Sequence, residues 1–319
     1  MPKVSVLVPN YNYERFLSLR LQSIADQTYR DFEVILLDDA STDKSPEIMR
    51  QFAARYGWLL APNTSNSGSV FKQWNKGLKL ARGEYVWIAE SDDYADPRFL
   101  ETLVPVLENN PKCGIVYCES LKIDAGGNPM GEVRPTAFGT RSERWNHDFT
   151  ASGQDEISNF FIQESTIPNA SAVLFRRKFY EIAGGIDESF RLSADYKFWA
   201  SILATSDLSY IATPLNFFRS HGATTRSKTR AWEHLAEMLR VMQFMAGRTS
   251  VPNEAMQDLH GRIGILFLYA FLSERPTWPK LKESWRLARG LGFRPSVRAL
   301  SGMAAHIGRG IRSRIKPKS

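Results

Sequence analysis

The chain has little cysteine and no long apolar segment among its 319 residues. Its two cysteines, Cys113 and Cys118, are too few for a zinc site, and the surrounding KCGIVYC is typical of a buried strand with reduced thiols. The longest apolar run, Ile263–Leu272, has about half the length that a bilayer span requires. The opening MPKVSVLVPN reaches a turn after one short apolar run, unlike a signal peptide. We therefore expect a cytoplasmic protein.

The sequence also lacks the glycine-rich motifs of two common nucleotide-binding folds. The turn after the first predicted strand reads PNYNYERF, whereas a dinucleotide-binding domain needs G-x-G-x-x-G at that point. The P-loop motif G-x-x-x-x-G-K-[ST] does not occur anywhere in the chain. Any nucleotide must therefore be held by another kind of site.

Charge is unevenly distributed along the chain. Residues 1–225 carry 23 Lys and Arg against 28 Asp and Glu, whereas residues 226–319 carry 18 against 6, a net charge of +12. The overall balance, 43% hydrophobic and 24% charged, excludes wholesale disorder. The basic segment favours an anionic partner, with a solvated basic face as the alternative. We expect an anionic membrane surface at the inner face of the membrane as this partner, and no nucleic acid.

The first 120 residues alternate between strand-like apolar runs and helical patterns. Strands are predicted at KVSVLVP, FEVILLDD, GWLLAP, EYVWIAESDD and CGIVYCE, with helical segments between them. This alternation predicts an α/β fold with a mostly parallel sheet and helices on both faces. Ligands of such sheets bind beyond the carboxyl ends of the strands, so candidate site residues are sought there.

The later regions have different patterns. Residues 125–165 are rich in Gly, Pro, Ser and Thr and predict loops over the site, and LSYIATPLNFFRSH predicts a late pair of strands. From residue 226 the pattern is helical, so we expect a first domain of residues 1–225 and a helical extension of residues 226–319. Residues 296–315 predict a basic amphipathic helix, suited to a membrane surface or to a homodimer interface.

Two acidic pairs stand at the ends of predicted strands. Asp38 and Asp39 end the second strand, and Asp92 and Asp93 end the fourth. Carboxylates crowded at one edge of a sheet repel one another and are costly to leave unpaired. Mg²⁺ or Mn²⁺ bridging to a diphosphate would relieve that cost, because both ions prefer oxygen ligands. One such pair is commonly a turn or a helix cap, but two pairs predict a site.

Four ordered segments, spanning roughly residues 3–227, resemble glycosyltransferase family 2. They are VSVLVPNYNYERFLSLRLQSIADQTYRDFEVILLDDASTDKS, NKGLKLARGEYVWIAESDDYADPRFLE, GGIDESFRLSADYKFWASIL and FFRSHGATTRS. The resemblance implies a Rossmann-like GT-A fold that binds a nucleotide-diphospho-sugar and a divalent metal. It further implies inverting transfer of the sugar to a glycan or lipid-linked acceptor, in bacterial surface polysaccharide synthesis.

The resemblance implies a nucleotide site built from the first, second and fourth strands. Pro9 and Tyr11 would line the nucleobase pocket. Asp39 would accept the N3–H of a uracil or thymine ring, which favours a UDP- or dTDP-sugar as donor. Asp92 would contact the ribose.

The same resemblance implies metal-binding and catalytic residues. Asp93 and His221 would hold Mn²⁺ or Mg²⁺, and Asp195 would be the catalytic base that takes the proton of the acceptor hydroxyl. The family usually has a glutamate before this aspartate, whereas this chain has Ala194. Candidate contacts to the acceptor or donor sugar are Gly184, Gly185 and Trp199.

Two other functions are alternatives. A nucleotidyltransferase shares the α/β layout and a metal-bound nucleotide, but PNYNYE lacks the glycine-rich, basic signature usual after its first strand. A non-catalytic nucleotide-sugar-binding protein has no need of a catalytic base, so the presence of Asp39, Asp92, Asp93 and Asp195 together argues against it.

Overall fold

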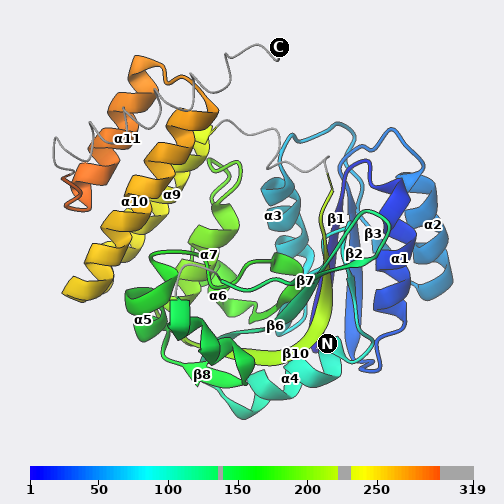
Figure 1. Ribbon diagram of the computed structural model, residues 1–319. Helices are drawn as coiled ribbons and strands as arrows, with labels where there is room; N and C mark the ends of the chain where they lie inside the picture. Colours follow the sequence, from blue (N-terminus) through cyan, green and yellow to red (C-terminus); the bar gives the residue numbers. More distant parts are fainter. Residues whose placement is uncertain (136–138, 222–230, 295–319) are drawn as a thin grey trace, which may run out of the picture.

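The computed structural model describes residues 1–135, 139–221 and 231–294, which form a central ten-stranded sheet flanked by helices (Figure 1). The main path of the sheet runs β3-β2-β1-β4-β9-β6-β10-β5, with β7 paired to β6 and β8 paired to β10. The strands are β1 Val4–Asn10, β2 Phe32–Asp38, β3 Leu59–Leu60, β4 Tyr85–Ile88, β5 Tyr94–Ala95, β6 Cys113–Ile123, β7 Pro129–Glu132, β8 Phe149–Ala151, β9 Val173–Arg176 and β10 Asp207–Arg219.

The helices lie between the strands and in a carboxyl-terminal group. The α-helices are α1 Glu14–Ala25, α2 Ser45–Tyr56, α3 Val70–Leu80, α4 Phe99–Asn109, α5 Gly153–Glu156, α6 Lys178–Ile182, α7 Ala194–Leu203, α9 Ala231–Ala246, α10 Asn253–Ser273 and α11 Trp278–Gly290. Shorter helical turns are η1 Gly139–Asn146, η2 Ile157–Phe161 and η3 Ala170–Ala172.

The mostly parallel α/β sheet predicted from the alternating pattern is confirmed. β1 pairs in parallel with β2 and β4, β2 pairs in parallel with β3, and β6 pairs in parallel with β10. β9 lies between β4 and β6 and is antiparallel to both, a reversal that the pattern did not indicate. The predicted pair of late strands was wrong, because residues 207–219 form the single strand β10, which bends at register shifts.

Each face of the sheet is covered by helices because the strands are apolar on both sides. In β1, Val4, Val6 and Val8 pack with α1, α2 and α4, whereas Leu7 packs with α3 on the opposite face. All four side chains are completely buried. The carboxyl ends of the strands therefore remain as the edge where polar side chains gather.

The expectation that residues 125–165 are loops was wrong for much of that segment. Its described residues include β7, η1, β8, α5 and η2, of which β7 and β8 extend the sheet. Trp145 in η1 is buried and donates from its indole N–H to the Tyr117 hydroxyl at 2.8 Å. Such burial anchors the segment to the core rather than leaving it as a free lid.

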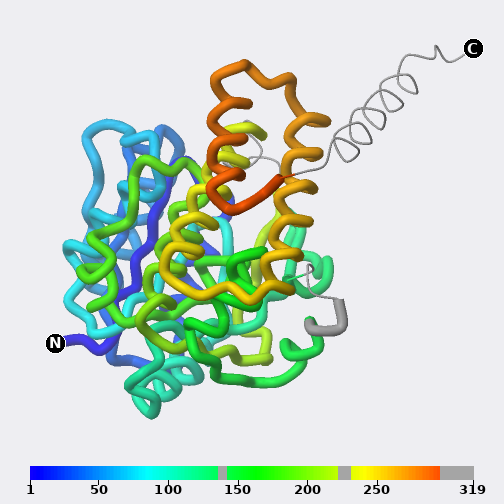
Figure 2. The backbone as a smooth tube through the Cα atoms, turned by 90° about the vertical axis from the view of Figure 1, so that its left-hand side faces the viewer, coloured from blue at the N-terminus to red at the C-terminus, as the bar shows by residue number. Residues whose placement is uncertain are grey.

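The helical extension is confirmed for residues 231–294. α9 packs against α7 and against α11, and α10 packs against α9. Figures 1 and 2 show this group of helices on the side of the molecule where β1 ends, away from the amino terminus. Within the described part of the chain, no helix is long and apolar enough to span a bilayer. The amphipathic helix at 296–315 and the domain boundary at residue 225 fall outside the described residues.

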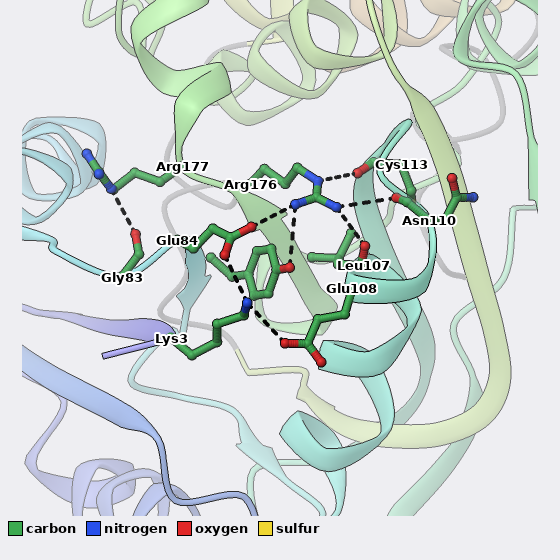
Figure 3. Close-up of polar contacts among 10 residues, drawn as sticks. Lys3, Gly83, Glu84, Leu107, Glu108, Asn110, Cys113, Arg176 and Arg177 are labelled. Atoms are coloured by element: carbon green, nitrogen blue, oxygen red, sulfur yellow. Dashed lines mark hydrogen bonds and ion pairs between the residues drawn. The ribbon is translucent and has the colours of Figure 1, made fainter. Parts of the chain in front are cut away.

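A network of ion pairs closes the amino-terminal edge of the sheet (Figure 3). Lys3 lies 2.9 Å from Glu84 and 3.0 Å from Glu108, and Arg176 lies 3.0 Å from Glu84. The Arg176 guanidinium also donates to backbone carbonyls at the end of α4 and the start of β6, those of Leu107, Asn110 and Cys113. A cation at a helix carboxyl end satisfies carbonyls that lack helical partners, so this edge is a structural closure.

Candidate functional site

The candidate site is the opposite, carboxyl-terminal edge, where β1, β2 and β4 end side by side. Asn10 at the end of β1 is level with Asp38 at the end of β2, and its carbonyl accepts the Asp39 N–H at 2.9 Å. The Ser91 hydroxyl, just beyond β4, donates to the Pro9 carbonyl at 2.7 Å. The two acidic pairs predicted to meet at this edge are thus brought to it by adjacent parallel strands.

Asp39 is buried in a shell of donors from the loop before α3 and from α3 itself. Its Oδ1 accepts from the Asn63 amide, the Ser67 N–H and the Gln73 amide at 2.6–2.9 Å. Its Oδ2 accepts from the Ser67 hydroxyl at 2.8 Å and the Asn66 amide at 3.2 Å. The carboxylate is therefore fixed and already hydrogen-bonded by the chain, and its predicted contact to a base stays a prediction.

The two other residues predicted at the nucleobase differ in exposure. Pro9 is buried within β1, so its backbone carbonyl and not its ring takes part in the edge. Tyr11, in the turn after β1, is 44% exposed. An exposed aromatic ring beside this edge provides a face on which a planar base could stack.

His221 is bound to Asp92. The His221 Nε2 lies 2.9 Å from Asp92 Oδ2, and the two side chains are 6% and 19% exposed. The ring of His221 packs against Tyr13 and Phe16, with centroids 5.8 Å and 5.2 Å away. The structure thus joins the predicted metal ligand His221 to the predicted ribose contact, and aromatic rings at the start of α1 hold the histidine in place.

Asp93 is almost fully buried and points into a polar shell. Its Oδ1 accepts the Arg219 backbone N–H at 2.9 Å, and its Oδ2 accepts from the Asn169 amide at 3.3 Å. Burial, followed by the charge of Asp92, raises the pKa of Asp93 to about 7. A cation beside this carboxylate would favour its charged form.

Glu90 is a third carboxyl group at this edge, and the motif comparison did not identify it. Its Oε1 accepts the Trp74 indole N–H at 2.8 Å. The pKa of Glu90 is raised to about 8, mainly by burial and further by the charges of Asp92 and Asp93. Three carboxyl groups within four consecutive residues therefore compete for negative charge.

Arg20 of α1 is a buried cation beside this group of carboxyls. Its Nε donates to the Glu90 carbonyl at 2.8 Å, and its guanidinium lies over the Trp87 ring at 5.6 Å. Within residues 1–135, 139–221 and 231–294, neither Nη atom of Arg20 has a hydrogen-bond partner. Burial lowers the pKa of Arg20 to about 10, while Asp93, Asp92 and Glu90 oppose that shift.

These residues fit a cation that is shared with a donor diphosphate. Among the described residues, no group of three His, Cys, Asp or Glu side chains is arranged as a metal site. Mg²⁺ is commonly held by one or two carboxylates together with substrate phosphates and water, so a complete protein cage is not needed. Asp93 would supply a carboxylate ligand, and the crowding of Glu90, Asp92 and Asp93 is the charge that a cation would offset.

Asp195 lies in the first turn of α7, where its Oδ1 accepts the N–H of Tyr196 at 2.7 Å. Helix α3 contacts both this region and the carboxyl edge. Trp74 binds Glu90, and the next residue, Asn75, binds the backbone of Ile186 in the loop before α7 at 2.9 and 3.0 Å. The loop before α7 and the acidic edge are therefore both hydrogen-bonded to α3.

Gly184 and Gly185 border a pocket between α6 and α7 of about 280 Å³. Their φ angles are +74° and +90°, the left-handed region that favours glycine. The other lining residues are Ala183, Asp187, Ala194, Lys197, Phe198 and Ser201. A sugar contact at these glycines stays a prediction.

Trp199 lies in the core and does not line this pocket. It is 1% exposed and packs against Trp74, Phe175 and Phe198. Because these neighbours cover the indole, it offers no free face to a sugar in this structure. Its position instead supports α7 against α3.

The residues that the motif comparison missed carry weak signals in the sequence. Arg20 lies on the apolar stripe of α1, four residues after Phe16 and three after Leu17, where a charged side chain must be buried with a partner. Asn169, which donates to Asp93, precedes the short strand β9 and follows no pattern that indicates a site.

A family comparison decides the class of protein. The model of "Glycosyl transferase family 2" matches residues 5–181, more than half of the chain. The chain belongs to glycosyl transferase family 2. The resemblance found in the sequence is thus confirmed.

Curated relatives of the chain carry glycosyltransferase names. An uncharacterized glycosyltransferase of Nostoc sp. is 27% identical over 306 residues, 90% of this chain and 87% of the relative. The poly(ribitol-phosphate) beta-N-acetylglucosaminyltransferase TarS of Staphylococcus aureus is 30% identical over 139 residues, 43% of this chain and 24% of TarS. An uncharacterized glycosyltransferase of Methanocaldococcus jannaschii is matched over 65% of its length.

Solved structures of this fold confirm the GT-A architecture. S. aureus TarS 1–349 in complex with UDP-GlcNAc has a TM-score of 0.69 at 18% identity, covering 91% of this chain and 80% of the other. The mannosyltransferase PcManGT from Pyrobaculum calidifontis, in complex with GDP-Man and Mn²⁺, has a TM-score of 0.58 at 19% identity, covering 97% and 81%. At these identities the likeness is one of fold.

Proposed function

We propose that this family 2 protein is a metal-dependent, inverting glycosyltransferase that uses a nucleotide-diphospho-sugar. The observation that carries the proposal is the group of carboxyls Glu90, Asp92 and Asp93 at the carboxyl edge, with His221 bound to Asp92. A divalent cation bound there with the donor would offset the negative charge that builds on the leaving diphosphate. Family membership favours this function over nucleotidyl transfer.

The chain's own residues would divide the work of the reaction. Asp93 would hold the cation against the diphosphate, with His221 as the second ligand. Asp92, whose carboxylate is bonded to His221, would contact the ribose. Asp195 would take the proton of the acceptor hydroxyl as the hydroxyl attacks the anomeric carbon from the face opposite the diphosphate. A carboxylate in that role contributes about 10²–10⁴-fold to the rate.

We favour a UDP-sugar as donor and a glycan or lipid-linked acceptor in surface polysaccharide synthesis. The TarS structure contains UDP-GlcNAc, and TarS is named for transfer to poly(ribitol-phosphate), which supports both choices by analogy. The GDP-Man complex of PcManGT makes guanine the natural competitor in a binding test.

We further infer that the carboxyl-terminal extension faces an anionic membrane surface. Residues 226–319 carry a net charge of +12, and α10 exposes Ile265, Tyr269 and Leu272 at helical spacing. Trp278 at the start of α11 is 74% exposed. Apolar and aromatic side chains beside basic ones are typical of a helix that lies in a bilayer interface. Sedimentation with anionic vesicles tests this inference. A protein that does not bind vesicles but dimerises with rising concentration would show instead that the extension is a dimer interface.

The decisive experiment is a thermal-shift panel of UDP-, dTDP- and GDP-sugars, each with Mn²⁺, Mg²⁺ or EDTA. We expect a shift for a uridine or thymidine donor that depends on the metal. We also expect release of the nucleoside diphosphate from the same donor, with water taking the sugar where no acceptor is added. Asp195→Asn should lower that release by about 10²–10⁴-fold while the donor-dependent shift survives. Full activity in EDTA would reject the metal role, and unchanged turnover in Asp195→Asn would reject the base.

A further inference from the structure

Glu237 of α9 binds the backbone directly before α7, although it is 42 positions after Asp195 in the sequence. Its Oε1 accepts the Arg191 N–H at 2.6 Å, and its Oε2 accepts the N–H groups of Leu192 and Ser193, each at 3.0 Å. The residue is 5% exposed. One buried carboxylate of the extension thus binds three consecutive backbone donors of the catalytic domain.

These contacts lie at the amino-terminal end of α7, which carries Asp195. Ser193 is the residue before the helix, and no side-chain cap hydrogen bond is made there by Ser193 itself. The N–H groups around a helix amino terminus lack helical partners and carry partial positive charge, so an anion at this point is stabilising. Glu237 supplies this anion from another helix.

The residue directly before Asp195 does not supply a carboxylate at this end of α7. Ala194, which directly precedes Asp195, is 1% exposed and has no polar side chain. The loop before α7 is held at its other end by Asn75 of α3. The segment 186–193 is therefore fixed between α3, which contacts the acidic edge through Trp74, and α9 of the extension.

We propose that Glu237 is a positioning residue for Asp195, so that the extension, whose helix α9 lies beside α7 (Figure 1), forms part of the catalytic unit. The inference rests on the proposed function, in which Asp195 is the base. Glu237 touches no reacting atom in this scheme. It fixes the backbone from which the first turn of α7 starts, and a displacement of about 1 Å in a catalytic group can lower the rate by about 10²-fold.

Glu237→Gln is the informative variant because it keeps the shape of the side chain. The amide retains one acceptor oxygen but turns an NH₂ group toward a backbone N–H, so at least one of the three hydrogen bonds is lost. We expect kcat for release of the nucleoside diphosphate from the best donor of the panel to fall about 10–100-fold. The donor KM and the donor-dependent thermal shift should stay within about twofold of wild type, a split that simple destabilisation does not produce.

The matched control is Glu233→Gln, one turn earlier on α9. Glu233 forms an ion pair with Lys280 of α11 at 3.1 Å and is not bonded to the segment before α7. Glu233→Gln removes the same charge from the same helix and should leave kcat unchanged. Hydrogen exchange provides a readout independent of activity: Glu237→Gln should speed exchange of the amides of residues 191–193, and Glu233→Gln should not.

Coupling to Asp195 is tested with the double variant Asp195→Asn, Glu237→Gln. If Glu237 acts through Asp195, it should cost little further activity once the base is gone. Unchanged kcat in Glu237→Gln, or equal losses of kcat in both backgrounds, would overturn the positioning role. Unchanged exchange of residues 191–193 would overturn the contact itself. A wild-type protein that turns over no donor would instead overturn the proposed function, and the inference with it.

Discussion

The two edges of the central sheet use the same residue types and have opposite electrostatics. At the amino-terminal edge, hydrogen bonding to Lys3 is the main cause of the lowered pKa of Glu84, and Arg176 adds to it. At the carboxyl-terminal edge, burial and crowding raise the pKa of Glu90 to about 8 and of Asp93 to about 7. The first edge pairs its charges with one another. The second keeps carboxyl groups together against the cost of burial.

This difference separates a structural edge from the candidate functional edge. Charges that satisfy one another stabilise the fold and need no further partner. Carboxyl groups whose ionisation is opposed by burial are stabilised by a positively charged partner. Such groups are common in sites that bind a cation or transfer a proton. Substitutions at the first edge should therefore lower stability, whereas substitutions at the second should lower activity without lowering stability.

The largest expected effect follows from Asp93→Asn. Removing this carboxylate should lower donor turnover by about 10²–10⁴-fold, because a bound metal provides several kcal/mol of stabilisation to the developing charge. The free energy of unfolding should not fall, since the asparagine oxygen can still accept the Arg219 N–H and a carboxyl whose ionisation is opposed by burial is removed. Turnover and urea denaturation, measured on one preparation, check the two statements. A variant with full activity but lower stability would place Asp93 with the structural edge.

Arg176→Met should produce the reverse result at the other edge. The substitution removes the charged donor that the Leu107, Asn110 and Cys113 carbonyls share, although Leu107 and Asn110 keep the backbone N–H groups of Asn110 and Cys113. We expect a loss of about 3 kcal/mol in the free energy of unfolding, with kcat of the folded protein unchanged. Urea denaturation measures the loss. A fall in kcat at unchanged stability would show that the edges are not separate in function.

The pH dependence of stability provides a test without any substrate. Between pH 4.5 and 8 the folded chain keeps the Glu90 proton, whereas the unfolded chain releases it. The unfolded state then binds fewer protons, so the free energy of unfolding falls as pH rises through this range. Glu90→Gln removes the Glu90 part of this slope. We expect its Tm to match wild type near pH 5 and to exceed it by about 2–6 °C at pH 8 in EDTA.

Asp93 contributes to the same slope, with a folded pKa of about 7 against an ordinary value of 3.8. The slope should therefore be reduced in Glu90→Gln but not abolished. Identical pH profiles for wild type and Glu90→Gln would show that Glu90 is not held protonated in the folded chain. Binding of donor and metal should not steepen this fall of stability with pH, because a bound cation favours the charged carboxylates.

Much of the fold could be predicted because its signals are local. Apolar runs such as that of Val4–Asn10 alternate with amphipathic helices, and this order is enough to indicate a mostly parallel sheet. The direction of β9 could not be predicted, since this short strand of three apolar residues followed by Arg176 reads the same in either orientation. Pairing partners at a distance in the chain decide that direction.

The candidate site was predictable where it lies in motifs and not where it depends on packing. Asp92 and His221 stand in recognisable patterns, and the structure brings them within 2.9 Å. Glu90 could not be assigned because its role depends on burial beside Trp74. Glu237 could not be found either, since its partners are backbone N–H groups, which carry no sequence signal.

The smallest expected effect belongs to Glu84→Gln, the matched counterpart of Glu90→Gln. Glu84 is 51% exposed, Lys3 keeps Glu108 as a partner, and Arg176 keeps its backbone acceptors, so the loss should stay below about 1 kcal/mol. Salt at about 0.5 M should reduce it further by screening. The same exchange of carboxylate for amide should thus destabilise slightly at one edge and stabilise at the other at pH 8. Equal signs in urea denaturation at that pH would remove the electrostatic distinction between the two edges.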